Sequence, residues 1–331
     1  MNEISNRQSL TFWNMKAFAV VAIVACHCCH VAENVGAVNR VTVTFFSYWI
    51  SYGVPVFYFI AGFFFKADDG VVVFWKKKLK TIIIPWIFTG TVVWCYVAFR
   101  KGGITIENWF KFLFMRDSYL YFLTDLICFY LVFCLIRNWK GYLVWIGGIL
   151  TLLTIYGEVA RIPLLIDNIP GHGLPMVNLW IFYVGVVARK YMLCKFFQSI
   201  KSSSFIILFI VIRTCQLYIW RSSVGIIINI VCAICFLIAL YSICYIMSEN
   251  EHRLIEKVGK NSFSIYLLHM PVAGIVANVL NRSEWFALFT FWRPMIVIGI
   301  TIVMIQWYTF IVRKKRNWLM LIGMRLSMET E

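Results

Sequence analysis

The sequence has few charged residues for its length. Aspartate, glutamate, lysine and arginine make up 14% of the 331 residues, whereas a soluble globular domain carries about a quarter. Hydrophobic residues account for 61% of the chain, and apolar runs long enough to cross a bilayer recur from its start to its end. The scarcity of charge therefore excludes a soluble fold and predicts a polytopic helical membrane protein.

Two other features are missing. No small-residue cleavage site follows the apolar N-terminal stretch, so we expect it to remain as the first membrane span. The 11 cysteines lie mostly within apolar runs, without the spacing of a disulfide framework, and are expected to pack as small hydrophobic side chains. Since no long linker or polar domain interrupts the chain, we expect one membrane domain over residues 1–331, with no separate soluble domain.

Cations outnumber acids, which gives a net charge of +16. Such an excess is also found in proteins that bind nucleic acids, but in a membrane protein lysine and arginine collect in the loops that stay in the cytoplasm. We therefore attribute most of the charge to membrane topology and expect no nucleic-acid partner.

The apolar runs predict ten spans. They are expected at residues 11–31, 42–65, 81–99, 119–136, 142–157, 174–188, 203–220, 225–247, 262–280 and 287–311. With the N-terminus inside, the inner segments hold most of the 31 lysines and arginines. This bias predicts an all-α bundle of about ten transmembrane helices, with both termini in the cytoplasm. A partly buried amphipathic segment is expected at residues 109–115.

Small and cyclic residues punctuate the predicted spans. Pro55, Pro85 and Pro271 fall in the second, third and ninth spans, where each removes a backbone donor and is expected to kink its helix. Gly62 is expected to allow a close approach of two helices.

The first predicted span carries two ionisable residues. Lys16 and His27 are 11 residues apart, close to three helical turns, so we expect them on one face, roughly 16 Å apart along the axis. An ionisable residue within a span usually faces the protein interior and marks a function. We predict that this helix lines a cleft at two depths and that Lys16 and His27 are its candidate catalytic residues. The imidazole would exchange a proton, and the ammonium would attract an anionic group. For His27 alone, the alternative is a histidine that only forms a hydrogen bond between helices.

The end of the same segment also suggests a metal site. Cys26 and Cys29 are three residues apart, as are His27 and His30, and this spacing allows chelation on a helix. A closed site needs further ligands, and the other candidate within a span is His269. We therefore expect no metal and expect these cysteines to pack as hydrophobic side chains.

A basic cluster precedes Pro85 and contains Lys76, Lys77, Lys78 and Lys80. One interpretation is topology alone, because loops that stay inside the cell collect lysine. The other is a basic collar that binds a polyanion such as the phosphates of coenzyme A.

An acid lies well inside the fourth predicted span. The charged form of Asp125 costs about 2.5–3.5 kcal/mol there, so we expect it to be protonated or paired. Its possible partners are Arg213, Arg293 and His269. Tyr121, on the same segment, is a further candidate for lining a cleft with Asp125.

The ninth predicted span carries a polar stripe. Ser262, Tyr266 and His269 recur at i, i+4 and i+7 and share one face of a helix, and Asn261 is placed to cap its start. A polar stripe in a span faces other helices or a cavity, so we count these three residues among the possible cleft-lining residues.

These stretches together resemble the acyltransferase-3 family of integral membrane acyltransferases, over nearly the whole chain. The family pattern has a basic residue, ten further residues and a histidine in its first span, which Lys16 and His27 match. The remaining motifs follow in the family's order. They are residues 54–64, residues 76–80 ahead of Pro85, residues 120–123, residues 182–185 and residues 259–269.

Several positions depart from the family pattern. Lys16 stands where arginine is usual, without the acidic residue that often precedes it, and the basic cluster is all lysine. Tyr121 replaces a tryptophan, and Ala61 replaces a serine. Lysine keeps the charge but lacks the bidentate fork of arginine, so we expect phosphate groups to be held in a different geometry. The length leaves no room for the additional hydrolase domain that some members carry.

The resemblance implies the transfer of an acyl group, expected to be acetyl, to a hydroxyl of a cell-surface glycan or its lipid-linked precursor. Acyl-CoA would be the donor, with its phosphates held by Lys16, Lys76, Lys78 and Lys80. His27 would be the general base, and an acyl-His27 intermediate is a second possibility. The resemblance also implies a bacterial inner membrane, with membrane lipid around the protein. The sequence carries no signal for an oligomeric state.

Two other classes of protein share these features. A transporter or flippase for a glycan or a small anion would also contain a multi-span cleft with buried ionisable groups. A metal-handling membrane protein would account for residues 26–30. Transfer from radiolabelled acetyl-CoA distinguishes the enzyme from the transporter, and elemental analysis tests for the metal.

Overall fold

The computed structural model describes residues 5–30, 41–42, 44–66, 70–115, 118–136, 143–159, 178–199, 202–219, 223–250, 252–280, 292–312 and 320–323. Within these ranges the regular structure is entirely helical, with no strand, which confirms the all-α class. The helical segments that are long and apolar enough to cross a membrane are Asn6–Cys28, Phe45–Phe63, Val71–Phe99, Val224–Met247, Ser262–Val279 and Arg293–Ile311. The shorter apolar helices of this part of the chain are Tyr121–Ile136, Trp145–Gly157 and Ser203–Gln216.

The chain forms two compact units. The first unit comprises Met1–Ala19, Val54–Ala67 and Thr124–Gly259, and the second comprises Val20–Gly53, Asp68–Leu123 and Lys260–Glu331. Helix α1 (Asn6–His30) begins in the first unit and ends in the second. Each unit is therefore assembled from segments that are far apart in the sequence.

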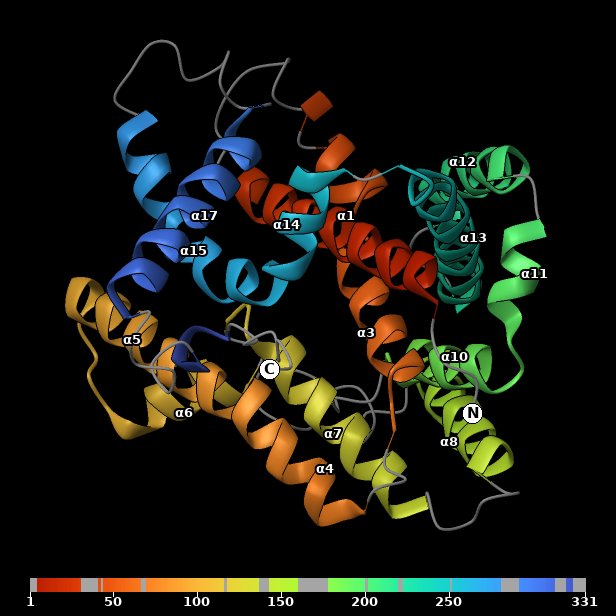
Figure 1. Ribbon diagram of the computed structural model, residues 1–331, viewed down its shortest axis with the longest axis horizontal. Coiled ribbons are helices and arrows are strands. Elements are labelled where there is room, and N and C mark those ends of the chain that lie inside the picture. The colour runs from red at the N-terminus through yellow and green to blue at the C-terminus, as the bar shows by residue number, and fades with distance from the viewer. Residues whose placement is uncertain are drawn as a thin grey trace. The chain divides into compact units, whose positions relative to one another are not determined.

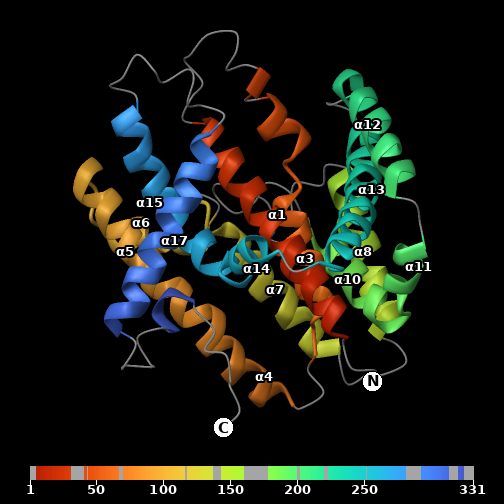
Figure 2. The same ribbon diagram turned by 45° about the horizontal axis from the view of Figure 1, so that its top comes forward.

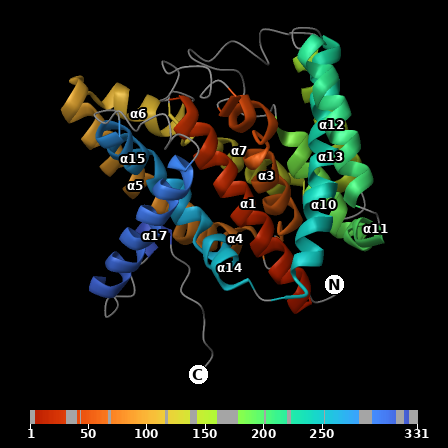
Figure 3. The ribbon, with the colours of Figure 1, turned by 90° about the horizontal axis from the view of Figure 1, so that it is seen from above.

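The first unit contains a group of mainly apolar helices. They are all or most of α3 (Gly53–Phe63), α7 (Tyr121–Ile136), α8 (Leu143–Val159), α10 (Leu179–Lys190), α11 (Leu193–Ser199), α12 (Ser202–Ile219), α13 (Ser223–Met247) and α14 (Arg253–Lys260). Helices α12 and α13 lie side by side (Figures 1 and 3), and α13 also contacts α8 and α11. The long helix α13 is therefore the common neighbour of much of this unit.

Helices α3 and α10 approach each other closely at two glycines. A Cβ atom on Gly62 would lie 2.0 Å from the carbonyl oxygen of Phe182, and one on Gly185 would lie 2.2 Å from that of Phe59. No side chain fits at such distances, so the two backbones are in direct contact. The close approach expected at Gly62 is confirmed, and small residues are what allow it between membrane helices.

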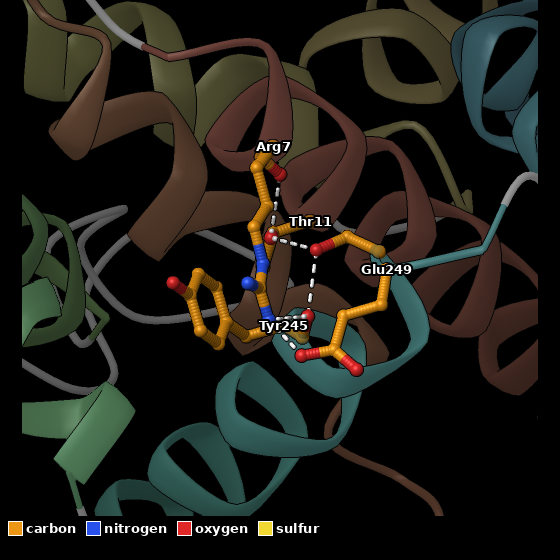
Figure 4. Close-up of polar contacts among 5 residues, drawn as sticks. Arg7, Thr11, Tyr245 and Glu249 are labelled. Carbon is orange, nitrogen blue, oxygen red and sulfur yellow. Dashed lines mark hydrogen bonds and ion pairs between the residues drawn. The ribbon is translucent and has the colours of Figure 1, made fainter.

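Polar contacts join the start of α1 to the end of α13 (Figure 4). The Arg7 guanidinium donates to Glu249 Oε1 at 2.6 Å and lies 3.9 Å from the centre of the Tyr245 ring. The Thr11 hydroxyl lies 2.8 Å from the carbonyl oxygen of Arg7 and 3.3 Å from the hydroxyl of Ser248. These contacts fix the beginning of α1 within the first unit.

The second unit contains the end of α1 and a further set of helices. They are η1 (Phe45–Trp49), α4 (Val71–Lys78), η2 (Leu79–Ile83), α5 (Ile84–Lys101), α6 (Ile106–Phe114), α15 (Ser262–Leu280), α17 (Arg293–Val312) and η3 (Met320–Ile322). Helix α15 packs against α17 and α5 (Figure 2), and α5 also contacts α6 and η3. Helix α15 is thus covered on two sides within this unit.

The amphipathic segment expected before the fourth span is helix α6. Thr105 caps its start by accepting a hydrogen bond from the backbone N–H of Asn108, and Trp109 donates its indole N–H to the Thr91 hydroxyl of α5 at 3.0 Å. On its exposed side, Lys111 lies 2.5 Å from Glu107 and lowers the pKa of that carboxyl. This short helix is held against α5 by its tryptophan.

The predicted second and third spans are less regular than expected. A turn at residues 50–52 separates η1 from α3, and Pro55 lies in the first turn of α3, where a missing N–H removes no helical bond. The third helical segment begins at Val71, after Gly70, so the lysine cluster lies on helical turns and not in a loop. The π-helical turn η2 comes directly before Pro85 and widens the helix where the proline ring would clash with the preceding turn.

The remaining predicted spans agree with observed helices within a few residues. Residues 142–157, 203–220, 225–247 and 262–280 correspond to α8, α12, α13 and α15. Residues 31, 43, 142, 174–177, 220 and 287–291 of the predicted spans lie outside the described part of the chain. The total of ten spans and the orientation of the termini stay predictions.

Candidate active site

The expected disruption at Pro271 creates a hydrogen-bonding site in the middle of α15. Proline has no N–H, so the carbonyl of Leu267, four residues earlier, loses its donor within the helix. The hydroxyl of Tyr119 donates to this carbonyl at 2.6 Å. The segment that precedes α7 is thereby attached to α15 at the one carbonyl that Pro271 leaves without a backbone N–H donor.

A second tyrosine returns this contact. The hydroxyl of Tyr266, on α15, donates to the backbone carbonyl of Tyr119, and the two rings meet edge to face with centroids 5.8 Å apart. Both side chains are buried. Because each tyrosine donates to a carbonyl on the other's segment, the position of Tyr119 against α15 is fixed by two reciprocal hydrogen bonds.

His269 lies one turn further along the same face of α15. Its side chain is fully buried, at 0% exposure, and its Nδ1 lies 2.6 Å from the carbonyl oxygen of Tyr266. Its Nε2 makes no hydrogen bond to a residue that the structure describes. Ser262 and Tyr266 are also buried, so the polar stripe predicted on the ninth span does face the protein interior.

His27 reaches this face from the end of α1. Its ring centroid lies 5.2 Å from that of His269 and 6.4 Å from that of Tyr119, and its side chain is half-buried. We call His27, Tyr119, Tyr266 and His269 the imidazole cluster. All four residues belong to the second unit. The cluster places a partly accessible imidazole, able to exchange a proton, beside a fully buried one.

Lys16 occupies a different environment, within the first unit. Its ammonium lies 4.3 Å from the ring centroid of Trp13 and 5.8 Å from that of Phe64, and its side chain is half-buried. Aromatic faces stabilise a cation through the ring quadrupole. The common cleft predicted for Lys16 and His27 stays a prediction.

The lysine cluster belongs to the second unit. Lys76 and Lys80 are exposed, whereas Lys78 is half-buried and holds its ammonium 5.2 Å from the ring centroid of Phe74. The helical turns of α4 and η2 thus present ammonium groups to the surroundings, where they can meet an anion.

Asp125 has a partner that the sequence did not indicate. The carboxylate is 1% exposed and accepts a hydrogen bond from the Tyr58 hydroxyl at 2.8 Å, within the first unit. Arg213, one of the partners considered, donates to the amide oxygens of Gln216 and Asn229. Tyr121 is half-buried at the first residue of α7.

The structure describes two of the cysteines near His27. Cys28 is buried, and the Cys26 thiol lies 3.4 Å from the carbonyl oxygen of Phe46. The side chains of Cys29 and His30 lie outside the described residues. In the part of the chain that the structure describes, no three histidine, cysteine, aspartate or glutamate side chains come together as metal ligands would.

Long apolar helices and buried ionisable side chains define the class of this molecule as a helical membrane protein. The model of the acyltransferase-3 family, described as an acyltransferase domain, matches residues 12–311, so the chain belongs to that family of acyltransferases. Comparisons with curated proteins and with solved structures give no match. The resemblance drawn from the sequence motifs is confirmed.

The structure brings together three of the site residues that the sequence predicts, His27, Tyr266 and His269. Tyr119 is not among the predicted residues. The available signal was Pro271, which leaves a carbonyl in need of a donor. A proline identifies the acceptor but not the residue that will supply the donor.

Proposed function

We propose that this protein transfers an acyl group, expected to be acetyl, from acyl-CoA to a hydroxyl of a cell-surface glycan or its lipid-linked precursor. Membership of an acyltransferase family supports the reaction class. The observation that carries the proposal is the imidazole cluster, in which half-buried His27 lies beside fully buried His269.

In the proposed reaction His27 is the general base. Its imidazole takes the proton of the acceptor hydroxyl while the hydroxyl oxygen attacks the thioester carbonyl. The new C–O bond forms, the C–S bond breaks, and the departing thiolate receives the proton from His27. General-base catalysis of this kind contributes roughly 10²- to 10⁴-fold to a rate.

The lysines are the proposed ligands of the donor's phosphates. Lys76 and Lys80 are exposed, and the half-buried ammonium of Lys78 is stabilised by the Phe74 ring. Lys16 is a further candidate cation. Lysine acts on phosphate as a point charge and not as a bidentate fork, so binding is expected to fall steeply as salt rises.

We further propose a single membrane domain of ten spans with both termini in the cytoplasm of a bacterial inner membrane. The charge bias along the sequence supports this topology. Reporter fusions that fluoresce only in the cytoplasm should be bright at both termini. A dark fusion at one end only would contradict an even number of spans, and dark fusions at both ends would contradict the orientation.

The central test uses purified protein in sealed proteoliposomes, radiolabelled acetyl-CoA and a lipid-linked saccharide extract as acceptor. Wild-type protein should release free CoA and label the saccharide, and His27→Ala should lose this activity. His252→Ala is the matched control, because His252 is exposed and lies just before α14. Undiminished transfer by His27→Ala would contradict the general-base role. Saccharide movement across the membrane without labelling would favour a transporter or flippase.

A second test concerns the donor. Changing Lys76, Lys78 and Lys80 to glutamine should raise the KM for acetyl-CoA and flatten its salt dependence, with kcat little changed. The control removes the same charge from the exposed lysines Lys190, Lys195 and Lys257. An equal KM for both triple variants would assign the lysine cluster to membrane topology alone.

A further inference from the structure

The hydrogen bond at Nδ1 assigns the tautomer of His269. A carbonyl oxygen only accepts, so the 2.6 Å contact with Tyr266 requires the proton on Nδ1. In a neutral imidazole the other nitrogen, Nε2, then carries the lone pair. Full burial favours this neutral form, since a charged ring would lose its hydration. His269 therefore presents a hydrogen-bond acceptor at Nε2.

That acceptor is unused among the described residues. Buried polar atoms in folded proteins nearly always have a partner, and leaving one without costs about 1–3 kcal/mol. The His269 ring is held through Nδ1, so its Nε2 is a buried acceptor in a fixed position that can receive a hydrogen bond from a further donor.

The neighbouring tyrosines cannot supply this donor. Each hydroxyl has a single proton, and those of Tyr119 and Tyr266 are committed to the carbonyl oxygens of Leu267 and Tyr119. Among the described residues, the ring of His27 also lies beside His269, with centroids 5.2 Å apart and planes inclined at 40°. A change in the His27 side-chain rotamer can direct an imidazole N–H toward Nε2.

We propose that His269 is a positioning residue for His27: in the reacting complex its Nε2 accepts a hydrogen bond from an N–H of the His27 ring. This inference rests on the proposed function. The bond selects the His27 tautomer whose other nitrogen is free to take the acceptor proton. When His27 becomes an imidazolium, the N–H donor is charged and the bond strengthens, so the stabilisation is larger in the transition state than before it.

The experiment compares two replacements of His269. His269→Phe keeps a ring of similar size without an acceptor, whereas His269→Gln offers an amide oxygen in its place. We expect His269→Phe to lower kcat roughly 10- to 100-fold, as loss of an orienting partner does in other sites, with the KM for acetyl-CoA unchanged. His269→Gln should recover most of the lost kcat. Ser264→Ala, a buried change on the same helix, should leave kcat as in wild type.

Several outcomes would overturn the proposal. They are a wild-type kcat in His269→Phe, and equal losses in the phenylalanine and glutamine variants accompanied by a raised KM. Wild-type turnover with His27→Ala inactive establishes the proposed function on its own, so an active His269→Phe would overturn the present inference alone. Failure of wild type to label any acceptor would instead remove the function on which it rests.

A second measurement is made on wild-type protein and does not depend on how the His269 variants fold. Wild-type protein labelled with ¹⁵N-histidine and saturated with acetyl-CoA should show an imidazole proton resonance that correlates with ring nitrogens of two histidines. The resonance should disappear in His27→Ala. Its absence from folded wild-type protein with bound acetyl-CoA would contradict the hydrogen bond between His27 and His269.

Discussion

Asp125 and His269 are buried ionisable residues of different units, and they differ in their hydrogen bonds. In the first unit, Asp125 is 1% exposed, and its carboxylate accepts a hydrogen bond from the Tyr58 hydroxyl. In the second unit, His269 is equally buried, but one of its two nitrogens has no hydrogen bond to a described residue. Burial alone therefore does not distinguish a structural group from a reactive one. The unused acceptor of His269 is the observation on which we base its proposed role in the reaction.

The largest difference between the two units is expected in how a substitution at a buried or half-buried ionisable residue changes kcat. His27→Ala removes the proposed base of the second unit and should lower kcat roughly 10²- to 10⁴-fold. Asp125→Asn in the first unit keeps the size of the side chain and an oxygen for Tyr58, so it should change kcat by no more than a few-fold. Both are measured by labelled acetyl transfer at equal amounts of folded protein. A hundred-fold loss in Asp125→Asn would break the comparison, since the carboxylate would then belong to the reaction.

The second-largest difference between the units is expected in the stability effect of replacing a helical glycine by alanine. Gly185→Ala places a Cβ atom 2.2 Å from the Phe59 carbonyl oxygen and should destabilise the protein by about 1–3 kcal/mol or more, because two backbones must move apart. Gly274→Ala in α15 meets nothing within 4 Å and should stabilise by roughly 0.5–1 kcal/mol through helix propensity. The readout is the midpoint of thermal unfolding in detergent. Equal shifts for the same chemical change would mean that α3 and α10 can separate freely.

The third test concerns the hydrogen bond from Tyr119 to the Leu267 carbonyl of α15, whose loss should destabilise the protein by about 1–3 kcal/mol. Tyr119→Phe leaves the buried carbonyl of Leu267 without its donor and should lower both the unfolding midpoint and kcat. Pro271→Ala restores the N–H that this carbonyl lacks. In the Pro271→Ala background, Tyr119→Phe should therefore cost much less stability. Additive effects in this double-mutant cycle would show that the two residues do not act on one carbonyl.

The smallest effect is expected at the exposed contacts of α1. The side chains of Arg7 and Glu249 are 38% and 59% exposed, and ion pairs of this kind contribute under about 1 kcal/mol. Arg7→Gln should shift the unfolding midpoint slightly, and less at high salt. A shift as large as that of Gly185→Ala would place the stability of the first unit in this contact and not in its glycine crossing.

The periodicity of the sequence predicts which face of a helix is buried, but it does not predict which residues form hydrogen bonds across the fold. The stripe of Ser262, Tyr266 and His269 follows from helical spacing alone, and all three are buried. Asp125 was recognised as needing a partner, but its donor, Tyr58, is 67 positions away and carries no charge that would single it out. Tyr119 was missed for a similar reason, since one of many tyrosines supplies the hydroxyl that Leu267 needs. Contacts across the fold depend on how helices cross, which a local pattern does not encode.

The helical breaks were predicted in part. Each proline was expected to disturb its span, and the turn at residues 50–52 and the widened turn before Pro85 lie close to two of them. The third helical segment begins at Val71, earlier than expected, because a cluster of four lysines is typical of a loop. The apolar residues that precede them, with Phe74 buried, are sufficient to extend the helix through the charges.

The widened turn η2 has a geometric effect on everything before it. One residue added to a helix swings the preceding part by about 100° around the axis. The direction in which Lys76 and Lys78 extend from the helix axis therefore depends on Pro85 and on the π-helical turn η2 that accommodates it, as well as on the positions of the lysines in the sequence. A homologue with the same lysines but an α-helical turn in place of η2 would present them on a different side of the helix.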